Sequence, residues 1–313
     1  MDGLLPIYKT KGVISKDVSR ILQKVIGKNH PIGHVGTLDP LAEGVLAIVL
    51  GKATRLQDYL LDVKKTYEFR VELGKHTDSL DADGAVLFEK PIVAFSKPQI
   101  LGALKELTGS YCQVPPLYSA VKWQGKPLYE YARAGRGDEV PLSELSRAIE
   151  IYAAELIDFG DHSISCRIEC SKGTYVRVFA YDLCSKLGNY GNVTFLKRTS
   201  AAGVSADRCL NLNEVSSKED VLSKLLPMEI LETGLPVLRV SQVVEEKLLQ
   251  GQKQIVAFPP ELNKIVSDTA LTDKDILLAG PSQKLFGIGM VLEQQELDEM
   301  GLKRFRIKLK RGL

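Results

Sequence analysis

Residues 33–44 read GHVGTLDPLAEG and lead directly into the aliphatic run VLAIVL at 45–50. Three glycines and one proline in this segment exclude a regular helix, so it predicts a shaped loop that feeds a buried strand. Pro40 disfavours the α region for the residue before it, which holds the Asp39 carboxylate in an extended presentation. By residue type alone, an Asp-Pro pair in a glycine-rich segment is typical of a turn.

The chain on both sides of this loop contains helical and extended patterns. Residues 15–26 and 96–108 are predicted helices, with Ser15 as the expected N-cap of the first. The predicted apolar faces comprise Val18, Ile21, Leu22, Val25 and Ile26 in one helix and Ile100, Leu101, Leu104 and Leu107 in the other. Residues 67–73 and 164–170 alternate apolar and polar side chains, as strands with one polar face do. Because such alternation favours antiparallel pairing, we expect an α+β fold with a mixed, mostly antiparallel sheet flanked by helices.

A domain boundary is predicted near residues 232–236, ETGLP. We expect two domains, 1–232 and 233–313, because 313 residues exceed what one hydrophobic core comfortably supports. The C-terminal part contains one amphipathic helix at 241–250 and short strand candidates at 237–240, 253–258, 276–278, 285–292 and 302–311. This pattern predicts a small, mostly β, barrel-like unit.

Positive charge is concentrated at the C-terminus. The chain carries 41 Lys+Arg and 39 Asp+Glu, a net charge of +2, whereas residues 301–313, GLKRFRIKLKRGL, hold six basic side chains and no acidic one. Phe305, Ile307 and Leu309 alternate with basic residues, which predicts a strand with one buried and one cationic face. Such a face suits a phosphate backbone, although a solvated strand that is basic by chance fits the composition equally well.

Missing motifs exclude several classes of function. The chain has no Walker loop, no GxGxxG and no HExxH, and its five cysteines contain no CxxC pair, which is typical of reduced thiols in a cytoplasm. The longest aliphatic run is far shorter than the roughly 20 residues of a membrane span, and no secretory signal is visible. Residues 78–84, DSLDADG, resemble a calcium loop but lack its first and last ligands, so an acidic turn is predicted there.

The loop at 33–44 closely resembles the G-H-x-G-x-L-D-P-x-A-x-G signature of the TruB-type tRNA pseudouridine-55 synthases. The resemblance continues in order along nearly the whole chain. Further matching segments are KTKG at 9–12, KTY at 65–67, PPLYSAVK at 115–122, SKGTYVR at 171–177 and FLKRT at 195–199. Thr10 stands where the family usually has a proline. Residues 233–313 are similar, in position and pattern, to the PUA domain of bacterial members.

This resemblance implies a pseudouridine synthase fold with a PUA domain, and conversion of uridine 55 in the T-loop of tRNA to pseudouridine. The N1–C1′ bond is broken, the uracil turns over, and C5 is joined to C1′. Because the overall change is an isomerisation, we expect no cofactor and no metal. The implied partner is the tRNA T-arm, without a membrane or an obligate protein partner, and the chain is expected to act as a monomer in the cytoplasm.

The resemblance implies that Asp39 is the catalytic carboxylate and Arg177 its cationic partner. Such a carboxylate could attack the sugar or the uracil ring, or could stabilise an oxocarbenium-like centre, and the sequence does not choose between these roles. It must stay ionised in a pocket that excludes water, which a guanidinium promotes. Without the resemblance, Arg177 could equally be a solvated residue of a helix predicted at 174–187.

The resemblance also implies that Tyr67 stacks on the uracil and takes the C5 proton, that Tyr175 packs beside the base, and that His34 inserts near the flipped nucleotides. By pattern alone Tyr67 is a core aromatic and His34 a loop histidine that caps a turn. The basic residues predicted to contact RNA are Lys9, Lys64, Lys65, Lys122, Lys126 and the cluster at 303–311.

Residues 123–143 mix glycine, basic and aromatic residues and resemble the mobile RNA-gripping segment of the family, so we expect them to order only when tRNA binds. One alternative function is a catalytically silent RNA-binding protein or RNA chaperone on the same scaffold, which would not need Asp39, Tyr67 and Arg177 together. Another, a guide-RNA subunit of the archaeal or eukaryotic kind, is disfavoured by the long segment at 110–143, which resembles the bacterial stand-alone form.

Overall fold

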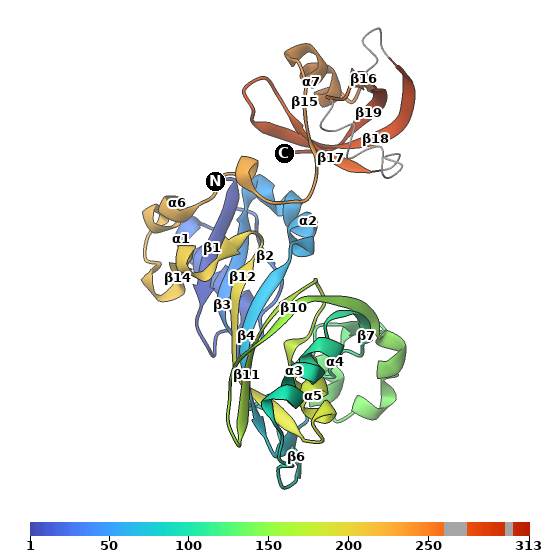
Figure 1. The fold of residues 1–313 in the computed structure, drawn as a ribbon. Coiled ribbons are helices and arrows are strands. Elements are labelled where there is room, and N and C mark those ends of the chain that lie inside the picture. The colour runs from blue at the N-terminus through green and yellow to red at the C-terminus, as the bar shows by residue number, and fades with distance from the viewer. Residues whose placement is uncertain (260–273, 298–302) are drawn as a thin grey trace.

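The computed structural model describes residues 1–259, 274–297 and 303–313, and two β-sheets dominate it (Figure 1). A ten-stranded sheet is built from strands between Gly3 and Asn211, and a five-stranded sheet from strands between Val237 and Gly312. Two further strand pairs are small hairpins, β5 (Lys75–Thr77) with β6 (Val86–Glu89) and β8 (Lys122–Trp123) with β9 (Lys126–Pro127).

The ten-stranded sheet has the order β14-β1-β3-β12-β4-β11-β10-β7, with β13 paired to β12 and β2 to β3. Its strands are β1 (Gly3–Lys9), β2 (Ile32–Val35), β3 (Glu43–Leu50), β4 (Lys65–Leu73), β7 (Gly109–Gln113), β10 (Arg147–Phe159), β11 (Ser163–Cys170), β12 (Gly191–Ala201), β13 (Val204–Ser205) and β14 (Leu210–Asn211). The pairs β1–β14 and β3–β12 are parallel and the other described pairs are antiparallel. The predicted mixed, mostly antiparallel sheet is confirmed.

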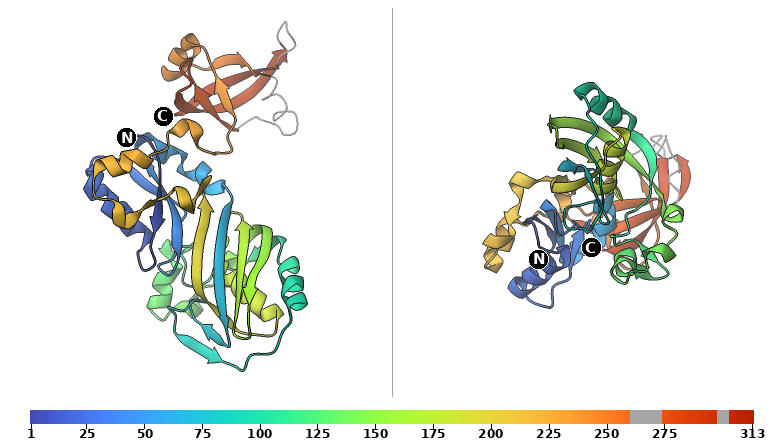
Figure 2. Two further views of the ribbon diagram at one scale, coloured as in Figure 1. Left: turned by 60° about the vertical axis from the view of Figure 1, so that its left-hand side comes forward. Right: turned by 90° about the horizontal axis from the view of Figure 1, so that it is seen from below.

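Helices bury the apolar faces of this sheet. They are α1 (Ser15–Ile26), α2 (Gln57–Asp62), α3 (Lys97–Glu106), α5 (Val176–Lys186) and α6 (Lys218–Lys224). A further helix, α4 (Leu128–Arg133), packs in a separate apolar cluster. Figure 2 shows α3 and α5 beside β10 and β11. Phe69 of β4 meets Phe179 of α5 edge to face, with ring centroids 6.0 Å apart. The predicted alternation at 67–73 is therefore confirmed as a strand whose apolar face packs on a helix.

Three details of the predicted helices are corrected. The N-cap of α1 is Ile14 rather than Ser15, because the Ser15 hydroxyl bonds to a distant loop instead of to its own helix. Ile21 and Leu101, placed on the buried faces by their spacing, are 36% and 47% exposed. Helix α5 begins at Val176, two residues later than predicted, since Tyr175 is still extended.

The five-stranded sheet has the order β15-β17-β18-β19-β16. This unit consists of β15 (Val237–Arg239), α7 (Gln242–Leu249), β16 (Gln254–Ala257), β17 (Asp275–Ala279), β18 (Leu285–Leu297) and β19 (Lys303–Gly312). In β19, Phe305 and Ile307 are buried while Arg304 and Arg311 are exposed, so the predicted basic strand is confirmed over its described residues. Leu302, the first residue of that prediction, lies outside them.

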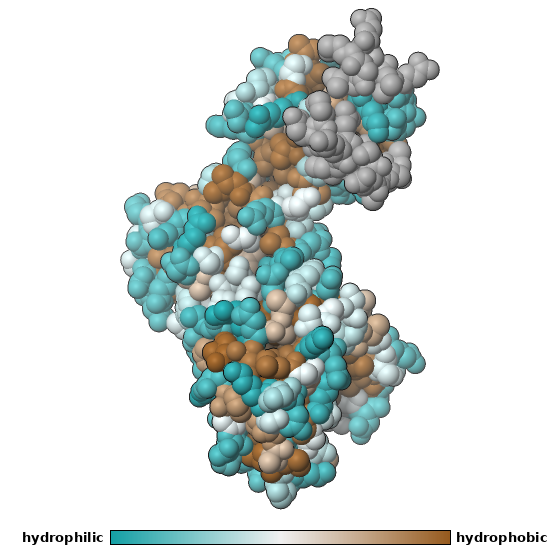
Figure 3. All heavy atoms as spheres, in the orientation of Figure 1, coloured by the Kyte–Doolittle hydropathy of each residue, from teal (hydrophilic) through white to brown (hydrophobic). Residues whose placement is uncertain are grey.

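The two sheets meet through a second apolar cluster, which joins Leu56 and Leu60 to Leu277 and Leu313. Figure 3 shows hydrophobic residues gathered at this junction. A polar contact accompanies it, in which the Tyr59 hydroxyl donates to Asp275. Burial of apolar side chains therefore stabilises the contact between the five-stranded sheet and the N-terminal part of the ten-stranded sheet.

The segment at 123–143 forms β8, β9 and α4 and has an apolar core of its own, in which Leu128, Tyr131 and Val140 are buried. Trp123 stacks at a tilt on Tyr131, with ring centroids 5.2 Å apart. These contacts give the segment a local fold, and whether it orders only when tRNA binds stays a prediction.

Candidate active site

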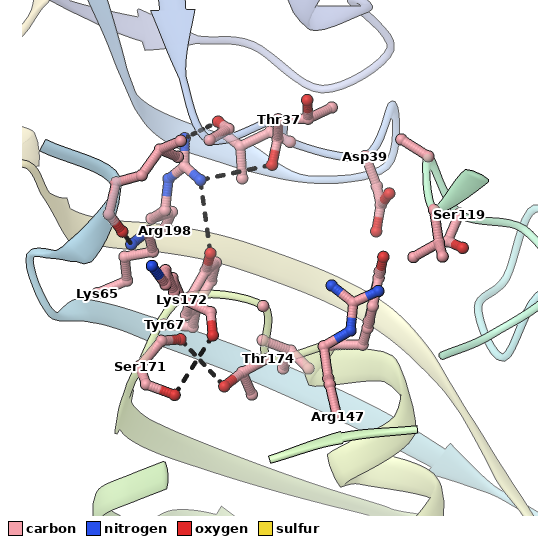
Figure 4. A pocket seen from close by; sticks show the side chains of 18 of the residues that line it. Thr37, Asp39, Lys65, Tyr67, Ser119, Arg147, Ser171, Lys172, Thr174 and Arg198 are labelled. Atoms are coloured by element: carbon pink, nitrogen blue, oxygen red, sulfur yellow. Dashed lines mark hydrogen bonds between the residues drawn. The ribbon is translucent and has the colours of Figure 1, made fainter. Parts of the chain in front are cut away.

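A cavity of about 500 Å³ opens between the loop that joins β2 to β3 and the turn that precedes α5 (Figure 4). It is lined by residues 36–39, Leu61, Lys65, Tyr67, 119–122, Arg147, 171–176, Leu196 and Arg198. The lining mixes apolar groups with several charged side chains from distant parts of the chain. Its volume is in the range of small-ligand sites.

The loop that carries Asp39 is held by hydrogen bonds from the segment before it. The Ser15 hydroxyl, at the start of α1, accepts from the Leu38 backbone N–H at 2.9 Å and donates to the Leu38 carbonyl at 3.0 Å. The Gly12 N–H donates to the Pro40 carbonyl at 2.8 Å. Both neighbours of Asp39 are thus fixed, which directs its carboxylate toward the cavity, as Figure 4 shows.

Lys9 supports this loop from inside the protein. Its side chain is fully buried, and its ammonium donates to the carbonyls of Thr10, Val13 and Pro40 at 3.1, 2.8 and 3.5 Å. The prediction that Lys9 contacts RNA is therefore corrected, because no part of the side chain is available to a phosphate. Its role is to pair backbone carbonyls that would otherwise be buried without donors.

Lys9→Met is expected to lower the free energy of unfolding by about 1–3 kcal/mol, because it leaves buried carbonyls unpaired. Burial lowers the pKa of Lys9 to about 8, whereas an unfolded lysine titrates near about 10.4. Between these values the unfolded chain binds more protons at this site, so Lys9 makes stability rise with pH in that window.

Urea unfolding at several pH values between 8 and 10 checks this prediction. The slope of stability against pH should be shallower in Lys9→Met than in the wild type. Lys16→Met, at an exposed position of α1, is the matched control and should change neither stability nor slope. Equal stability of Lys9→Met and the wild type across this range would contradict the assigned role.

Arg177, in the first turn of α5, lies behind the cavity lining and pairs with Asp39 from there. Its side chain is 2% exposed, and its Nε donates to Asp39 Oδ2 at 2.8 Å. Its two terminal nitrogens donate to the carbonyls of Ser79 and Tyr118. The solvated alternative for Arg177 is therefore wrong. The Asp39 side chain remains 35% exposed, so its carboxylate is paired on one side and open to a ligand on the other.

A second carboxylate, which the sequence did not single out, reaches the same guanidinium. Asp81 Oδ2 lies 3.6 Å from Arg177 Nε, and the Ser79 hydroxyl donates to Asp81 Oδ1 at 2.5 Å. Burial raises the pKa of Asp81, while the Ser79 hydrogen bond and the Arg177 charge oppose that rise. Because the N-terminus of a helix disfavours a cation, two acids together hold the arginine at the start of α5.

Arg198 of β12 connects the loop to the tyrosine of the site. It is 1% exposed, its Nε donates to the Val45 carbonyl at 2.8 Å, and one terminal nitrogen donates to the Gly36 carbonyl at 2.9 Å. The other terminal nitrogen lies 3.5 Å from the Tyr67 hydroxyl, and burial raises the pKa of Tyr67. Gly44 lies against this strand at φ +102, where a Cβ would come within 2.2 Å of the Arg198 carbonyl oxygen.

The backbone of Tyr175 is held by Gln113, a residue of the edge strand β7. Its N–H donates to Gln113 Oε1 at 2.8 Å, and Gln113 Nε2 donates to its carbonyl at 3.2 Å. Gln113, at the end of β7, is 2% exposed. Because both backbone groups of Tyr175 are paired, its ring has a defined place in the cavity wall.

The other residues predicted to bind RNA fall into different environments. Lys65 lines the cavity, but it is 6% exposed and its ammonium donates to two backbone carbonyls. Lys122 lines the cavity and is exposed. His34 lies on β2 outside the cavity lining, with its Nε2 3.3 Å from the Thr37 hydroxyl, and burial lowers the pKa of its imidazole.

Several of the outer basic residues already have acidic partners. The ion pairs are Lys64 with Glu169, Arg306 with Glu293, and Lys310 with Asp275. Lys126, like Arg304 and Arg311, is exposed. RNA contact by any of these side chains stays a prediction.

Four polar residues of the site were not assigned to it from the sequence: Asp81, Gln113, Arg147 and Arg198. Arg198 lies within the matched segment at 195–199, and Asp81 within the acidic turn, which the structure places between β5 and β6. No local pattern marks Gln113 or Arg147, because their roles arise from strand pairing. Among the described residues, no group of three or more His, Cys, Asp or Glu side chains could hold a metal ion. Within the same residues, no helix has the length and apolar character to cross a membrane.

The fold and this carboxylate–arginine cavity define a pseudouridylate synthase, and the family model described as TruB family pseudouridylate synthase (N terminal domain) matches residues 23–176. A relative from Hydrogenovibrio crunogenus, named tRNA pseudouridine synthase B, is 34% identical over 95% of this chain and 92% of its own. Relatives of the same name from Staphylococcus aureus (strain MW2) and Aromatoleum aromaticum are 34% and 39% identical, over 94% and 83% of this chain and 96% and 82% of their own. The chain belongs to the TruB family.

Solved structures with the same fold include a chain of a Cbf5–Nop10–Gar1 complex, with a TM-score of 0.70 and 19% identity over 99% of this chain and 84% of that one. A chain of an H/ACA RNP bound to a substrate RNA containing 2′-deoxyuridine matches with a TM-score of 0.70 and 18% identity over the same shares. Both matches extend through the five-stranded sheet. The predicted pseudouridine synthase fold with a PUA-like C-terminal unit is confirmed.

Proposed function

We propose that the chain converts uridine to pseudouridine in tRNA, at position 55 of the T-loop. The observation that carries this proposal is the ion pair of Asp39 with Arg177, 2.8 Å long, at the wall of a cavity that a nucleobase can enter. The names of the full-length relatives supply tRNA as the substrate class. The match of residues 33–44 to the family signature supports the position within tRNA.

In the proposed reaction the N1–C1′ bond breaks, the uracil rotates, and C5 bonds to C1′. C5 then loses its proton and N1 gains one, so the product is an isomer of the substrate. Asp39 acts on the sugar or the ring as a nucleophile, or stabilises positive charge at C1′. All three roles use a free oxygen of the carboxylate, and the hydrogen bond from Arg177 Nε to Oδ2 leaves Oδ1 available for them. The exposed side of the Asp39 carboxylate is the side that faces the substrate.

We propose a more restricted role for Tyr67 than the family resemblance implies. Burial raises the pKa of the phenol, so Tyr67 is neutral at physiological pH. A neutral hydroxyl accepts the C5 proton only if it passes its own proton to another group. Its ring lines the cavity and offers a stacking surface for the base, as the clamped ring of Tyr175 does from the turn before α5.

We propose that a domain at 1–232 carries out catalysis and that a PUA-like domain at 233–313 makes a second contact with the RNA. Exposed Arg304 and Arg311 on β19 support a phosphate-binding surface on the second domain. The target uridine must leave its stack to reach Asp39, and His34 is the residue proposed to approach the opened loop. We further propose that the chain acts in the cytoplasm as a monomer, without an obligate protein partner.

Tritium release from tRNA labelled with [5-³H]uridine tests this proposal, because bond formation at C5 displaces that hydrogen. We expect about one equivalent of tritium from the wild-type transcript, and none from a transcript in which cytidine replaces uridine 55. Equal release from both transcripts would contradict the position. Binding without release from either would favour the silent RNA-binding alternative.

A further inference from the structure

Arg147 is a cation of the cavity that has no acidic partner among the residues that the structure describes. It opens β10, where its backbone pairs with Gln113 of β7. Its guanidinium carbon lies 5.7 Å from the centre of the Tyr175 ring, within the range of a cation–π contact. In the described part of the chain, no ion pair or hydrogen bond of its side chain is found. Figure 4 shows the guanidinium reaching into the same space that Asp39 faces.

Most other cations of the cavity are already committed. Lys65 and Arg198 donate to backbone carbonyls, and Lys172 forms an ion pair with Asp62. Lys122 also lines the cavity, but it is exposed to solvent. Arg147 is half-buried, so water or a ligand in the cavity can supply the acceptors for its N–H groups. Arg147 therefore has donor capacity directed at whatever enters the cavity.

The turn before α5 leaves room for the Arg147 side chain beside the cavity. Gly173 adopts φ +81, and a Cβ there would lie 3.2 Å from Arg147 Cδ. A glycine at this turn thus permits the aliphatic part of the arginine to cross it closely. The contact with the Tyr175 ring uses none of the guanidinium N–H groups in a hydrogen bond, and paired N–H groups of a guanidinium are what binds phosphate oxygens.

We propose that Arg147 binds the backbone phosphate next to the extruded uridine and so positions the nucleotide over Asp39. This inference rests on the proposed function. A nucleotide that enters the cavity brings a phosphate anion close to the Asp39 carboxylate, and a fixed cation between them offsets their repulsion. Gln113 fixes the backbone of Tyr175, and Arg147 contacts its ring, so these residues together can hold the base and the phosphate of the same nucleotide.

Arg147→Gln and Arg147→Lys, assayed on T-arm stem–loop RNA, test this proposal. We expect Arg147→Gln to lower kcat/KM by about 10- to 100-fold, mainly through KM, and Arg147→Lys to recover part of the loss. Two further RNAs carry a single uncharged methylphosphonate, one on the 5′ side and one on the 3′ side of the target uridine. On the RNA that lacks the contacted phosphate, wild type and Arg147→Gln should have equal kcat/KM values.

The control variant is Arg20→Gln, an exposed arginine of α1 paired with Asp17, which should behave as wild type on all three RNAs. If Arg147→Gln loses the same factor on both methylphosphonate RNAs as on the unmodified RNA, Arg147 does not bind either phosphate and the proposal is overturned. A wild type that releases no tritium from the unmodified stem–loop would instead contradict the proposed function. Both Arg147 variants should have the unfolding midpoint of the wild type within error, which would show that their lower kcat/KM is not caused by a loss of stability.

Discussion

Asp39→Asn is expected to lower kcat by at least about 10⁴-fold while tRNA affinity changes by less than about threefold. The size of the loss follows from the removal of a group without which no covalent or charge-stabilised route remains. Asparagine keeps the shape of the side chain, and its amide oxygen can still accept from Arg177 Nε. The loop around position 39 is held by Ser15 and Lys9 through backbone groups, so it should keep its place.

Single-turnover tritium release and equilibrium binding to the same tRNA measure the two quantities separately. Asp83→Asn is the matched control, because Asp83 is an exposed acid of the neighbouring turn whose own side chain is not part of the cavity lining. It should retain wild-type turnover. Turnover above about one tenth of wild type in Asp39→Asn would remove this carboxylate from the chemistry.

Arg177→Met is expected to cost about 3–5 kcal/mol of stability as well as turnover. Methionine fills much of the same volume, but it leaves the carboxylates of Asp39 and Asp81 facing each other without a cation. The carbonyls of Ser79 and Tyr118 also lose their donors. A buried charge without a partner is among the most costly changes a folded protein can undergo.

The destabilisation should depend on pH in a defined direction. Burial already raises the pKa of Asp81 in the folded protein, and loss of the guanidinium would raise it further. A carboxyl group with a raised folded-state pKa binds its proton more tightly in the folded than in the unfolded chain. Stability is therefore retained at low pH and lost as pH rises through that pKa, so Arg177→Met should be less destabilised at pH 5 than at pH 8.

Urea unfolding at both pH values checks this expectation, and Arg167→Met is the matched control. Arg167 lies on β11 and pairs with Glu68 at a side chain that is 49% exposed, so its loss should cost less than about 1 kcal/mol at either pH. An equal loss of unfolding free energy in Arg177→Met and Arg167→Met would contradict the claim that the buried ion pair contributes more than an exposed one. Arg177→Lys should be intermediate, since an ammonium keeps the charge but cannot span the same acceptors.

Much of the secondary structure followed from local spacing. The alternation at 67–73 and 164–170 identified two strands, and the structure pairs them directly, with Phe69 opposite Cys166. The helix at 15–26 has the predicted bounds. Spacing could not reveal how far each side chain of a helix is covered, since Ile21 and Leu101 fit the apolar stripe but stay 36% and 47% exposed.

The site shows a similar division. Residues 33–44 and 171–177 pointed to Asp39 and Arg177, and the structure brings these residues together although 138 positions separate them. The surface role expected of Lys9 was wrong because a lysine looks the same in sequence whether solvent or backbone carbonyls surround it. Asp81 and Gln113 were not assigned to the site from the sequence either, because the sequence does not show which groups surround a polar side chain.

Local sequence determined the extended loop at Asp39, the strands and helices around it, and the basic alternation of the last strand, because each depends on side-chain size and polarity within a few residues. The partners of the charged groups depend instead on sheet order. Placing β4 between β11 and β12, and β7 at the edge beside β10, brings Tyr67 to Arg198 and Gln113 to Tyr175. Burial and charge pairing are properties of that assembly, since an acid or a base acquires its environment only when distant segments pack around it.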